Sequence, residues 1–180
     1  MSKFYKLTVE SIIQETEKSV AIGFKIPDEL KQIFNFIPGQ YITIEKELNG
    51  EKLRRAYSIC ESVQSEHLKI GVKRVEGGSF SVFATTSLKV GDVLDVSPPE
   101  GRFTLEIDPT HSNTYLAFAA GSGITPVLSM ISSVLALEKQ SKFVLVYGNK
   151  NQEEVMFKNA LNAFKLAYPD RLVITNVFSQ

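Results

Sequence analysis

The fold class follows from residues 114–137, which read TYLAFAAGSGITPVLSMISSVLAL. Thr114–Ala120 is an almost unbroken apolar run, and such a run predicts a strand that is buried on both faces. After Gly121-Ser122-Gly123, the residues Ile124–Leu137 carry apolar side chains at helical spacing. A buried strand that passes through a glycine turn into a helix is typical of an α/β domain with a parallel sheet.

The pattern continues toward the C-terminus. Phe143–Tyr147 predicts a second buried strand, Gln152–Leu166 a second helix with an imperfect apolar stripe, and Leu172–Val177 a third strand. The order β-α-β-α-β is half of a doubly wound parallel sheet. Because three strands leave sheet edges unpaired, we expect the sequence to be a fragment of a longer protein.

The first hundred residues have a different pattern, in which short alternating or β-branched runs are separated by turn signals. Many short strands at such spacing predict a small antiparallel barrel or sandwich. Ser79–Leu88 predicts a short helix between two of these strands. With Pro109–Asn113 as a linker, we expect one domain at residues 1–109 and a partial α/β domain at residues 110–180. The predicted strands are Tyr5–Ile13, Val20–Ile26, Tyr41–Ile44, Arg55–Ile59, His67–Val75, Val93–Val96 and Phe103–Ile107.

The composition excludes several classes of protein. The chain has 180 residues, 43% of them hydrophobic, with 12 Phe and 6 Tyr, which excludes intrinsic disorder. Its 20 basic residues balance 20 acidic ones, and this argues against nucleic acid or an anionic membrane surface as a partner. The single Cys60 excludes a disulfide framework, a four-cysteine zinc site and a cysteine-ligated iron–sulfur cluster within this chain. The N-terminus is no secretory signal and no apolar run approaches a membrane span, so we expect a cytoplasmic protein, with no metal site.

The segment Gly121-Ser122-Gly123-Ile124-Thr125-Pro126 joins the first buried strand to its helix. Glycines let a backbone approach a diphosphate, and a helix N-terminus presents free amides and the positive end of its dipole. The spacing departs from the G-x-G-x-x-G fingerprint because Pro126 stands in place of the third glycine. Tyr147-Gly148-Asn149-Lys150 stands where an acidic ribose ligand usually ends the second strand. The alternative is that these glycines only form a tight turn.

Two segments of the first domain carry groups suited to a flat ligand that bears phosphate. In Arg55-Ala56-Tyr57-Ser58, the arginine can hold a phosphate, the tyrosine can stack on a ring, and the serine hydroxyl can reach a ring nitrogen. Gly77-Gly78-Ser79-Phe80-Ser81 is a glycine loop that opens the predicted helix, and its amides and hydroxyls suit an anion. The alternatives are a surface arginine beside a half-buried tyrosine, and a hairpin turn followed by a serine N-cap.

Taken together, these segments resemble in order and spacing the motifs of the ferredoxin–NADP reductase superfamily. Members of that superfamily pair a flavin-binding antiparallel barrel with a nicotinamide-binding α/β domain. Arg55–Ser58 matches the R-x-Y-S motif, Gly78–Ser81 the G-x-x-S element, and Gly121–Pro126 the G-x-G-I-T-P segment. Gly101-Arg102-Phe103 resembles the loop between the last strands of the barrel. The resemblance spans essentially the whole sequence.

Within the superfamily, Leu145–Lys150 and Met156-Phe157 look most like reductases of multicomponent oxygenases, of the phenylacetyl-CoA oxygenase reductase type. Those proteins continue into a plant-type [2Fe–2S] domain, whose four cysteines this sequence lacks. The resemblance implies a flavoprotein that takes hydride from NADH or NADPH onto FAD. It also implies that electrons pass to a protein acceptor, an oxygenase or a ferredoxin-like protein, in phenylacetate degradation. Gln180 stands where relatives that prefer NADP often carry an arginine, which indicates no contact with a 2′-phosphate.

The resemblance also implies roles for individual residues. Tyr57 would stack on the flavin ring, Ser58 would hydrogen-bond near its N5, and Arg55 would neutralise the diphosphate. Val72 and Lys73 would line the flavin through their backbone, although an ordinary strand pair is the alternative. The expected catalytic residues are Tyr57, Ser58 and Thr125. The expected cofactor-binding set is Arg55, Tyr57, Ser58, Val72, Lys73, Gly78, Ser79, Phe80, Ser81, Gly121, Gly123, Thr125 and Pro126.

Two other functions stay open on the sequence alone. One is a non-catalytic electron-relay or nucleotide-sensing module that holds flavin without turnover, and the other is a cofactor-free scaffold. Intact Arg55, Tyr57 and Ser58 argue against the scaffold. Because hydride transfer requires no acid–base pair, we interpret His67 and His111 as ordinary surface residues. We interpret Cys60 as a small buried hydrophobe.

Overall fold

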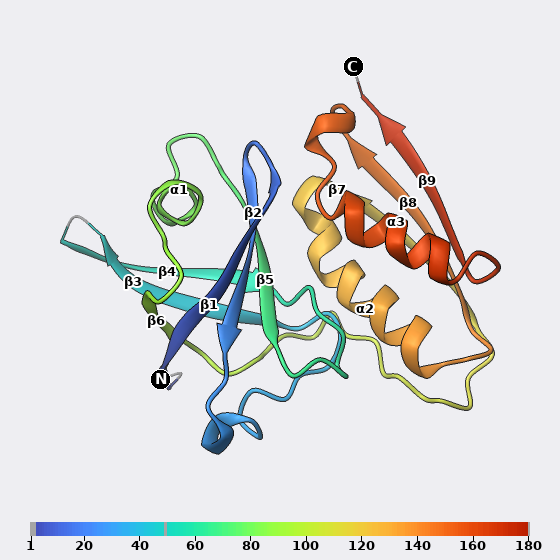
Figure 1. Cartoon of the computed structure of the whole chain (residues 1–180), viewed down its shortest axis with the longest axis horizontal. Coiled ribbons are helices and arrows are strands. Elements are labelled where there is room, and N and C mark those ends of the chain that lie inside the picture. The colour runs from blue at the N-terminus through green and yellow to red at the C-terminus, as the bar shows by residue number, and fades with distance from the viewer. Residues whose placement is uncertain (1–2, 49, 180) are drawn as a thin grey trace.

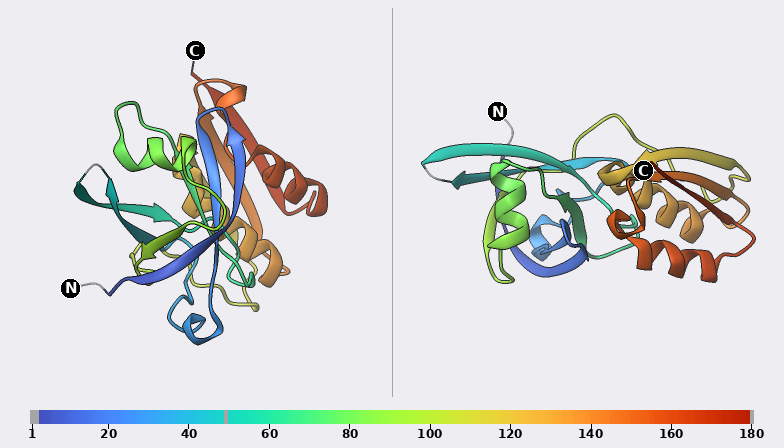
Figure 2. Two further views of the ribbon diagram at one scale, coloured as in Figure 1. Left: turned by 60° about the vertical axis from the view of Figure 1, so that its left-hand side comes forward. Right: turned by 90° about the horizontal axis from the view of Figure 1, so that it is seen from above.

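The computed structural model describes residues 3–48 and 50–179, which form two units built on separate sheets. The six-stranded antiparallel sheet is called the barrel here (residues 5–96), and the three-stranded parallel sheet with its helices is called the α/β unit (residues 114–178). The two units lie side by side (Figure 1, Figure 2). Their architecture confirms the predicted fold class. Gln180, on which the prediction about the 2′-phosphate rests, lies outside the described residues.

The barrel has the strand order β4-β3-β6-β1-β2-β5, with every neighbouring pair antiparallel. A bridge between Ile59 and Ile70 links the end of β4 to β5 and so closes the sheet. The elements are β1 (Tyr5–Thr16), β2 (Ser19–Lys25), the one-turn helix η1 (Asp28–Leu30), β3 (Tyr41–Leu48), β4 (Glu51–Ser58), β5 (Leu68–Lys73), α1 (Ser79–Thr86) and β6 (Val93–Val96).

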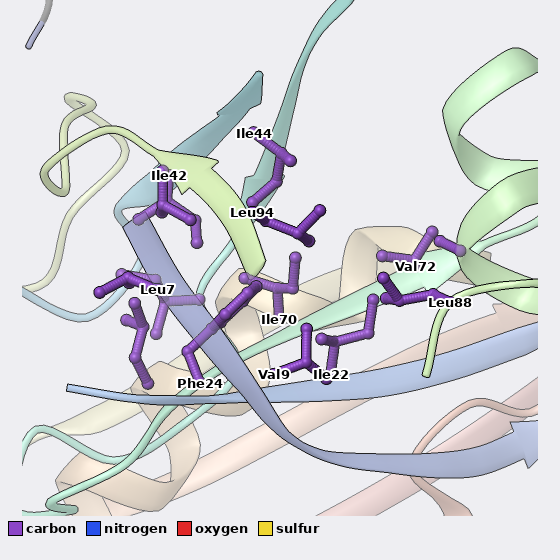
Figure 3. Close-up of a cluster of buried hydrophobic side chains, with 14 of the residues drawn as sticks. Leu7, Val9, Ile22, Phe24, Ile42, Ile44, Ile70, Val72, Leu88 and Leu94 are labelled. Atoms are coloured by element: carbon purple, nitrogen blue, oxygen red, sulfur yellow. The ribbon is translucent and has the colours of Figure 1, made fainter. Parts of the chain in front are cut away.

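The barrel core is built by alternation along the strands, which sends every second side chain inward. Ile22 and Phe24 of β2 and Ile70 and Val72 of β5 are fully buried, and Figure 3 shows them meeting side chains from β1, β3 and β6. Helix α1 adds Phe80 to the same core. The opposite face of β5, which carries Lys69, Gly71 and Lys73, is therefore turned away from this core.

The α/β unit has the parallel strand order β7-β8-β9, with Leu145 opposite Ala117 and Ile174. Helices α2 and α3 lie on one side of this sheet (Figure 2). Its elements are β7 (Thr114–Ala120), η2 (Gly121–Gly123), α2 (Ile124–Leu137), β8 (Lys142–Asn149), η3 (Gln152–Glu154), α3 (Lys158–Ala167) and β9 (Leu172–Phe178). The predicted β-α-β-α-β order is confirmed. None of the helices within residues 3–48 and 50–179 combines the length and hydropathy that a membrane crossing requires.

Three local predictions are wrong. Strand Thr114–Ala120 is not buried on both faces, because helices cover only one face and leave Phe118 74% exposed on the other. Phe103–Ile107 forms no strand; a single backbone bond from the Leu105 amide to the Pro38 carbonyl (3.1 Å) ties it down. Gln152–Leu166 is not one helix, because the left-handed backbone of Phe157 separates η3 from α3.

A buried polar network holds the connection between the two units against the end of α2. Glu138 is fully buried, and its carboxylate accepts hydrogen bonds from the Tyr115 hydroxyl (2.9 Å) and the Asp108 amide (3.2 Å). The ring nitrogen Nδ1 of His111 lies 3.2 Å from the same carboxylate. His111 therefore differs from the expected surface residue, because it is half-buried and belongs to this network. Arg171 donates hydrogen bonds to carbonyl oxygens at the end of α2.

The Glu138 carboxylate gives the fold a pH-dependent contribution to stability. Burial acts to raise the pKa of Glu138, but hydrogen bonds from Ser141, Tyr115, the Asp108 amide and His111 outweigh it and hold the pKa below 4.5. Between the folded pKa and 4.5, Glu138 therefore binds more protons in the unfolded chain than in the folded chain. The stability that the charged carboxylate contributes is full above pH 4.5 and is lost as the pH falls through the folded pKa.

We expect Glu138→Gln to lower the free energy of unfolding by about 2 kcal/mol at neutral pH, because buried hydrogen bonds to a charged group are lost. In urea titrations, the difference from the parent should shrink as the pH falls below the ordinary carboxyl pKa of 4.5. Glu106→Gln, at an exposed position two residues before Asp108, is the matched control. A difference for Glu138→Gln that is the same at neutral and acid pH would contradict this assignment.

Candidate functional site

The three motif segments line one cavity of about 570 Å³ between the barrel and the start of α2. Figure 1 and Figure 2 show β5 between α1 and α2, so this strand lies where the two units meet. A smaller cavity of about 300 Å³ lies near η1, and none of the motif residues lines it. The larger cavity is lined by Arg55, Ala56, Tyr57, Ser58, Gly71, Lys73, Val75, Gly78, Ser79, Phe80, Ser81, Ser122, Gly123, Thr125 and Pro126.

Strand β4 supplies a cation whose charge is available to a ligand. Arg55 is exposed, and its Nη1 donates a hydrogen bond to the Arg54 carbonyl oxygen (2.8 Å). Within the described ranges, no carboxylate lies at ion-pair distance from Arg55. Its neighbour Arg54 is instead bound to Glu45 (2.7 Å). Of this pair, only Arg55 lines the cavity, so it is the arginine that can meet a phosphate there.

Tyr57 offers a flat ring at the cavity wall. Its ring lies 5.5 Å from the ring of the buried Phe80, at an interplanar angle of 40°. Burial raises the pKa of Tyr57 to about 12, so the phenol is protonated at physiological pH. A neutral ring held from behind by Phe80 is suited to stacking against a planar ligand.

The glycine loop before α1 brings backbone amides to the cavity. Gly77 has a φ of 71°, which favours glycine. At Gly78 there is no room for a side chain, because a Cβ would lie 2.6 Å from the Ser81 hydroxyl. That hydroxyl accepts a hydrogen bond from the Val75 amide (3.1 Å) and so ties the loop to the helix. The first amides of α1, which lack partners within the helix, and the Ser79 hydroxyl can therefore hold an anion.

The second glycine loop belongs to the α/β unit and is held by two side-chain hydrogen bonds. Gly121 has a φ of 49°, and its carbonyl oxygen accepts a hydrogen bond from the buried Tyr147 hydroxyl (2.9 Å). The Thr125 hydroxyl donates to the Ser122 carbonyl oxygen (2.9 Å). Burial raises the pKa of Tyr147 to about 12, so this hydroxyl keeps its proton. These bonds fix the loop at the mouth of the cavity.

Another cavity, of about 350 Å³ and called the second cavity here, lies at the carboxyl ends of the parallel strands, where open α/β sheets bind ligands. Asn149 lines it and is 7% exposed, yet among the residues that the structure describes neither Nδ2 nor Oδ1 has a hydrogen-bond partner. Lys73 lines both cavities, and its Nζ lies 2.7 Å from Glu154. The hydrogen bond from Lys73 holds the pKa of Glu154 below its ordinary value. The second cavity is therefore lined by a residue whose buried amide has no partner among the described residues and by the Lys73–Glu154 ion pair.

Most of the residues expected at the site come together in the first cavity. Gly121 instead lines the second cavity. Val72 lines neither, because its side chain is fully buried in the barrel core, so only its backbone is left for a role there. Cys60 is buried as predicted, and burial raises the pKa of its thiol. His67 is exposed, as expected, beside Glu10.

Sequence reasoning missed four residues at this site. Asn149 had a signal, since Tyr147–Lys150 replaces the usual acidic ribose ligand. Glu154 and Gly71 had none, and Phe157 appeared only within the resemblance at Met156-Phe157, because each matters through a contact between the two units. Contacts between segments far apart in the sequence cannot be predicted from the local spacing of apolar residues.

The comparisons with known proteins agree with this arrangement. Residues 6–105, which are 100 of the 180 residues, match the family described as Oxidoreductase FAD-binding domain. The chain belongs to this family. Residues 118–180 match a second family, Oxidoreductase NAD-binding domain. The barrel thus falls in the FAD-binding match and most of the α/β unit in the NAD-binding match.

Relatives of this chain include proteins named as parts of oxygenase systems. A component of the 1,2-phenylacetyl-CoA epoxidase of Escherichia coli (strain K12) is 41% identical over 100% of this chain and 51% of the relative. The 3-ketosteroid-9-alpha-monooxygenase ferredoxin reductase component of Rhodococcus rhodochrous is 36% identical over 94% and 48%. The ferredoxin-NADP+ reductase structure from Plasmodium falciparum has a TM-score of 0.81 at 23% identity, covers 98% of this chain and 74% of that one, and shows the same fold. The chain spans about half the length of the curated relatives it matches.

The residues around the first cavity fit FAD. Arg55 and the amides at the start of α1 suit a diphosphate, and Tyr57 offers a neutral face to a ring system. A Cβ at Gly123, which lines the same cavity, would meet no atom from elsewhere in the described chain within 4 Å, so the missing side chain leaves open space there. The donor set therefore matches the chemistry of a flavin dinucleotide.

Proposed function

We propose that this chain is the FAD- and nucleotide-binding part of an NAD(P)H-dependent flavoprotein reductase that passes electrons to a protein acceptor. Residues 1–109 would form the FAD-binding domain and residues 110–180 part of the nucleotide-binding domain. The observation that carries the proposal is that one cavity is lined by Arg55–Ser58, by Gly78–Ser81, and by Ser122, Gly123, Thr125 and Pro126. Lys73 joins that cavity to a second one at the carboxyl ends of the parallel strands.

When bound, FAD supplies the redox chemistry by accepting a hydride from the nicotinamide. The residues of this chain bind and orient. Arg55 and the amides of Ser79 and Phe80 neutralise the diphosphate, Tyr57 stacks on the ring system, and Ser58 donates a hydrogen bond to it.

The loop of the α/β unit positions the other reactant. Gly121 and Gly123 let the dinucleotide approach, and Thr125 and Pro126 close the loop over the cavity that holds the flavin. Asn149 supplies an amide to the dinucleotide, because both of its polar atoms lack partners within the described residues and it lines the second cavity. No proton needs to be held on the enzyme for this transfer.

The acceptor is proposed from the relatives. One of them is named as part of an epoxidase and another as the ferredoxin reductase component of a monooxygenase. We therefore propose an oxygenase component or a ferredoxin-like protein as the acceptor, reached through a [2Fe–2S] centre outside residues 1–180. The identity of 41% to the phenylacetyl-CoA epoxidase component favours phenylacetate degradation.

Titration of the cofactor-free protein with FAD tests the first half of this proposal. Saturation at one FAD per chain, with a shift of the flavin absorption bands, supports the assignment. A protein that binds neither FAD nor FMN would refute it. Bound flavin that NADH cannot reduce would favour the electron-relay or sensing module instead.

Thr125→Val tests the role of the nucleotide loop. Valine has nearly the same shape but removes the hydroxyl that donates to Ser122 (2.9 Å), so the loop loses its internal tie. We expect the rate of flavin reduction by NADH to fall about tenfold, as for one lost hydrogen bond of about 1 kcal/mol plus misplacement of the loop, with FAD still bound. Anaerobic stopped-flow absorbance measures the rate, and Thr125→Ser, which keeps the hydroxyl, is the control. Equal rates of flavin reduction in the parent and in Thr125→Val would contradict a role of the Thr125 hydroxyl in positioning the loop.

A further inference from the structure

Gly71 is a point of close approach between the barrel backbone and the α/β unit. A Cβ at this position would lie 2.5 Å from Cγ2 of Thr125 and 2.8 Å from Cζ of Phe157. Ala21, directly opposite Gly71 on β2, is 1% exposed and packs into the core of the α/β unit. Two small residues thus let the loop that carries Thr125 approach the barrel closely, beside the flavin cavity.

Phe157 meets Gly71 in a strained conformation. Its φ of 58° and ψ of 26° place it in the left-handed region, and it is the one non-glycine residue with a positive φ in the part of the chain that the structure describes. Such a conformation in a bulky residue persists only where its surroundings impose it. Here the ring is buried against Gly71, and the amide donates a hydrogen bond to the Glu15 carboxylate of β1 (3.0 Å). Both restraints come from the barrel.

The segment Glu154–Phe157 therefore contacts the barrel at three places. Glu154 pairs with Lys73 (2.7 Å), the Phe157 amide binds Glu15, and the Phe157 ring packs on Gly71. Lys73 and Gly71 stand two residues apart on the same face of β5. The contacts fix how far the loop at Ser122–Thr125 stands from the cavity wall. Transfer between two bound reactants requires reacting atoms about 3–3.5 Å apart, so this separation matters for rate.

We propose that Gly71 is a positioning residue, which together with Phe157 and Glu15 sets the spacing between the flavin cavity and the nucleotide loop. The proposal rests on the function proposed above and adds to it a joint between the units. The joint affects the rate of hydride transfer. FAD binding depends instead on Arg55, Tyr57 and the loop before α1. Any side chain at position 71 would push Thr125 and Phe157 outward.

Gly71→Ala tests this spacing directly. The added methyl group must displace Thr125 or Phe157, and a displacement near 1 Å can slow a transfer about 100-fold. We expect the limiting rate of flavin reduction at saturating NADH to fall by at least tenfold in the FAD-loaded chain, while FAD affinity stays within about threefold. Gly23→Ala is the matched control, because the atom that crowds its Cβ is the rotatable Ser11 hydroxyl, which lies within the barrel. Adding Thr125→Ser, which removes the nearest methyl and keeps the hydroxyl, should restore most of the lost rate.

A second readout does not depend on turnover. Hydrogen exchange of the Phe157 amide, measured without NADH, should speed up at least tenfold in Gly71→Ala and in Glu15→Ala, because the bond to Glu15 is weakened or lost. Glu15→Gln keeps an acceptor oxygen and should retain most of the protection. Amides of the barrel core, such as that of Ile22, should be unaffected in all three variants.

The two proposals fail in different ways. If NADH does not reduce the flavin of the parent chain, the proposed function fails, and the exchange data still decide whether the joint exists. An unchanged Phe157 exchange rate in Gly71→Ala would overturn the positioning role whatever the kinetics. A parent-like limiting rate in Gly71→Ala would overturn it as well.

Discussion

Replacing Arg55 with alanine is expected to weaken FAD binding by about 10- to 100-fold. Hydrogen bonds to charged groups contribute about 1.5–3 kcal/mol, and each 1.4 kcal/mol corresponds to about a factor of ten in affinity. Arg55 has this effect because its guanidinium lines the cavity and pairs with no carboxylate in the described ranges. Fluorescence titration of the cofactor-free protein with FAD measures the change.

Arg54→Ala is the control for Arg55→Ala. It removes the same charge one residue away, but Arg54 is bound to Glu45 (2.7 Å) and does not line the cavity. Its loss should change FAD affinity by less than about threefold, since exposed ion pairs contribute little. If the two variants lose affinity equally, the effect is one of net charge, and Arg55 has no specific phosphate contact.

Phe80→Ala is expected to have the largest effect on stability. Phe80 is 1% exposed, joins the barrel core to α1 and supports the ring of Tyr57. Truncating a buried phenylalanine typically lowers the free energy of unfolding by about 3–5 kcal/mol, through lost burial and the cavity left behind. Urea unfolding followed by far-ultraviolet circular dichroism measures this loss, which should also reduce FAD affinity because Tyr57 loses its backing.

Phe103→Ala provides the comparison for this loss. Phe103 is 65% exposed, so the same truncation should change the free energy of unfolding by less than about 0.5 kcal/mol. A Phe80→Ala variant as stable as Phe103→Ala would show that α1 is not held by this side chain.

The elements with strong local patterns could be predicted from the sequence. Helix α2 begins and ends where the apolar spacing placed it, at Ile124 and Leu137. The three motif segments also meet as the resemblance implied, because each sits where a strand ends or a helix begins, and the topology brings those ends to one cavity.

Other features depend on contacts that a local pattern does not contain. The apolar run of β7 could not predict that helices cover only one face of the strand, which leaves Phe118 exposed. The apolar stripe over 152–166 does not report that Glu15 and Gly71 hold Phe157 in a left-handed conformation that interrupts the helix. Glu15 lies 142 positions away in sequence, so only the folded chain shows this restraint.

The central claim is that one cavity binds flavin within reach of a nucleotide held by the α/β unit. The visible absorption spectrum of the FAD-loaded protein, recorded anaerobically before and after NADH is added, tests it most directly. We predict flavin bands that bleach on addition of NADH and return when air is admitted. A colourless protein that neither FAD nor FMN restores, or flavin bands that persist in excess NADH and NADPH, would contradict the claim.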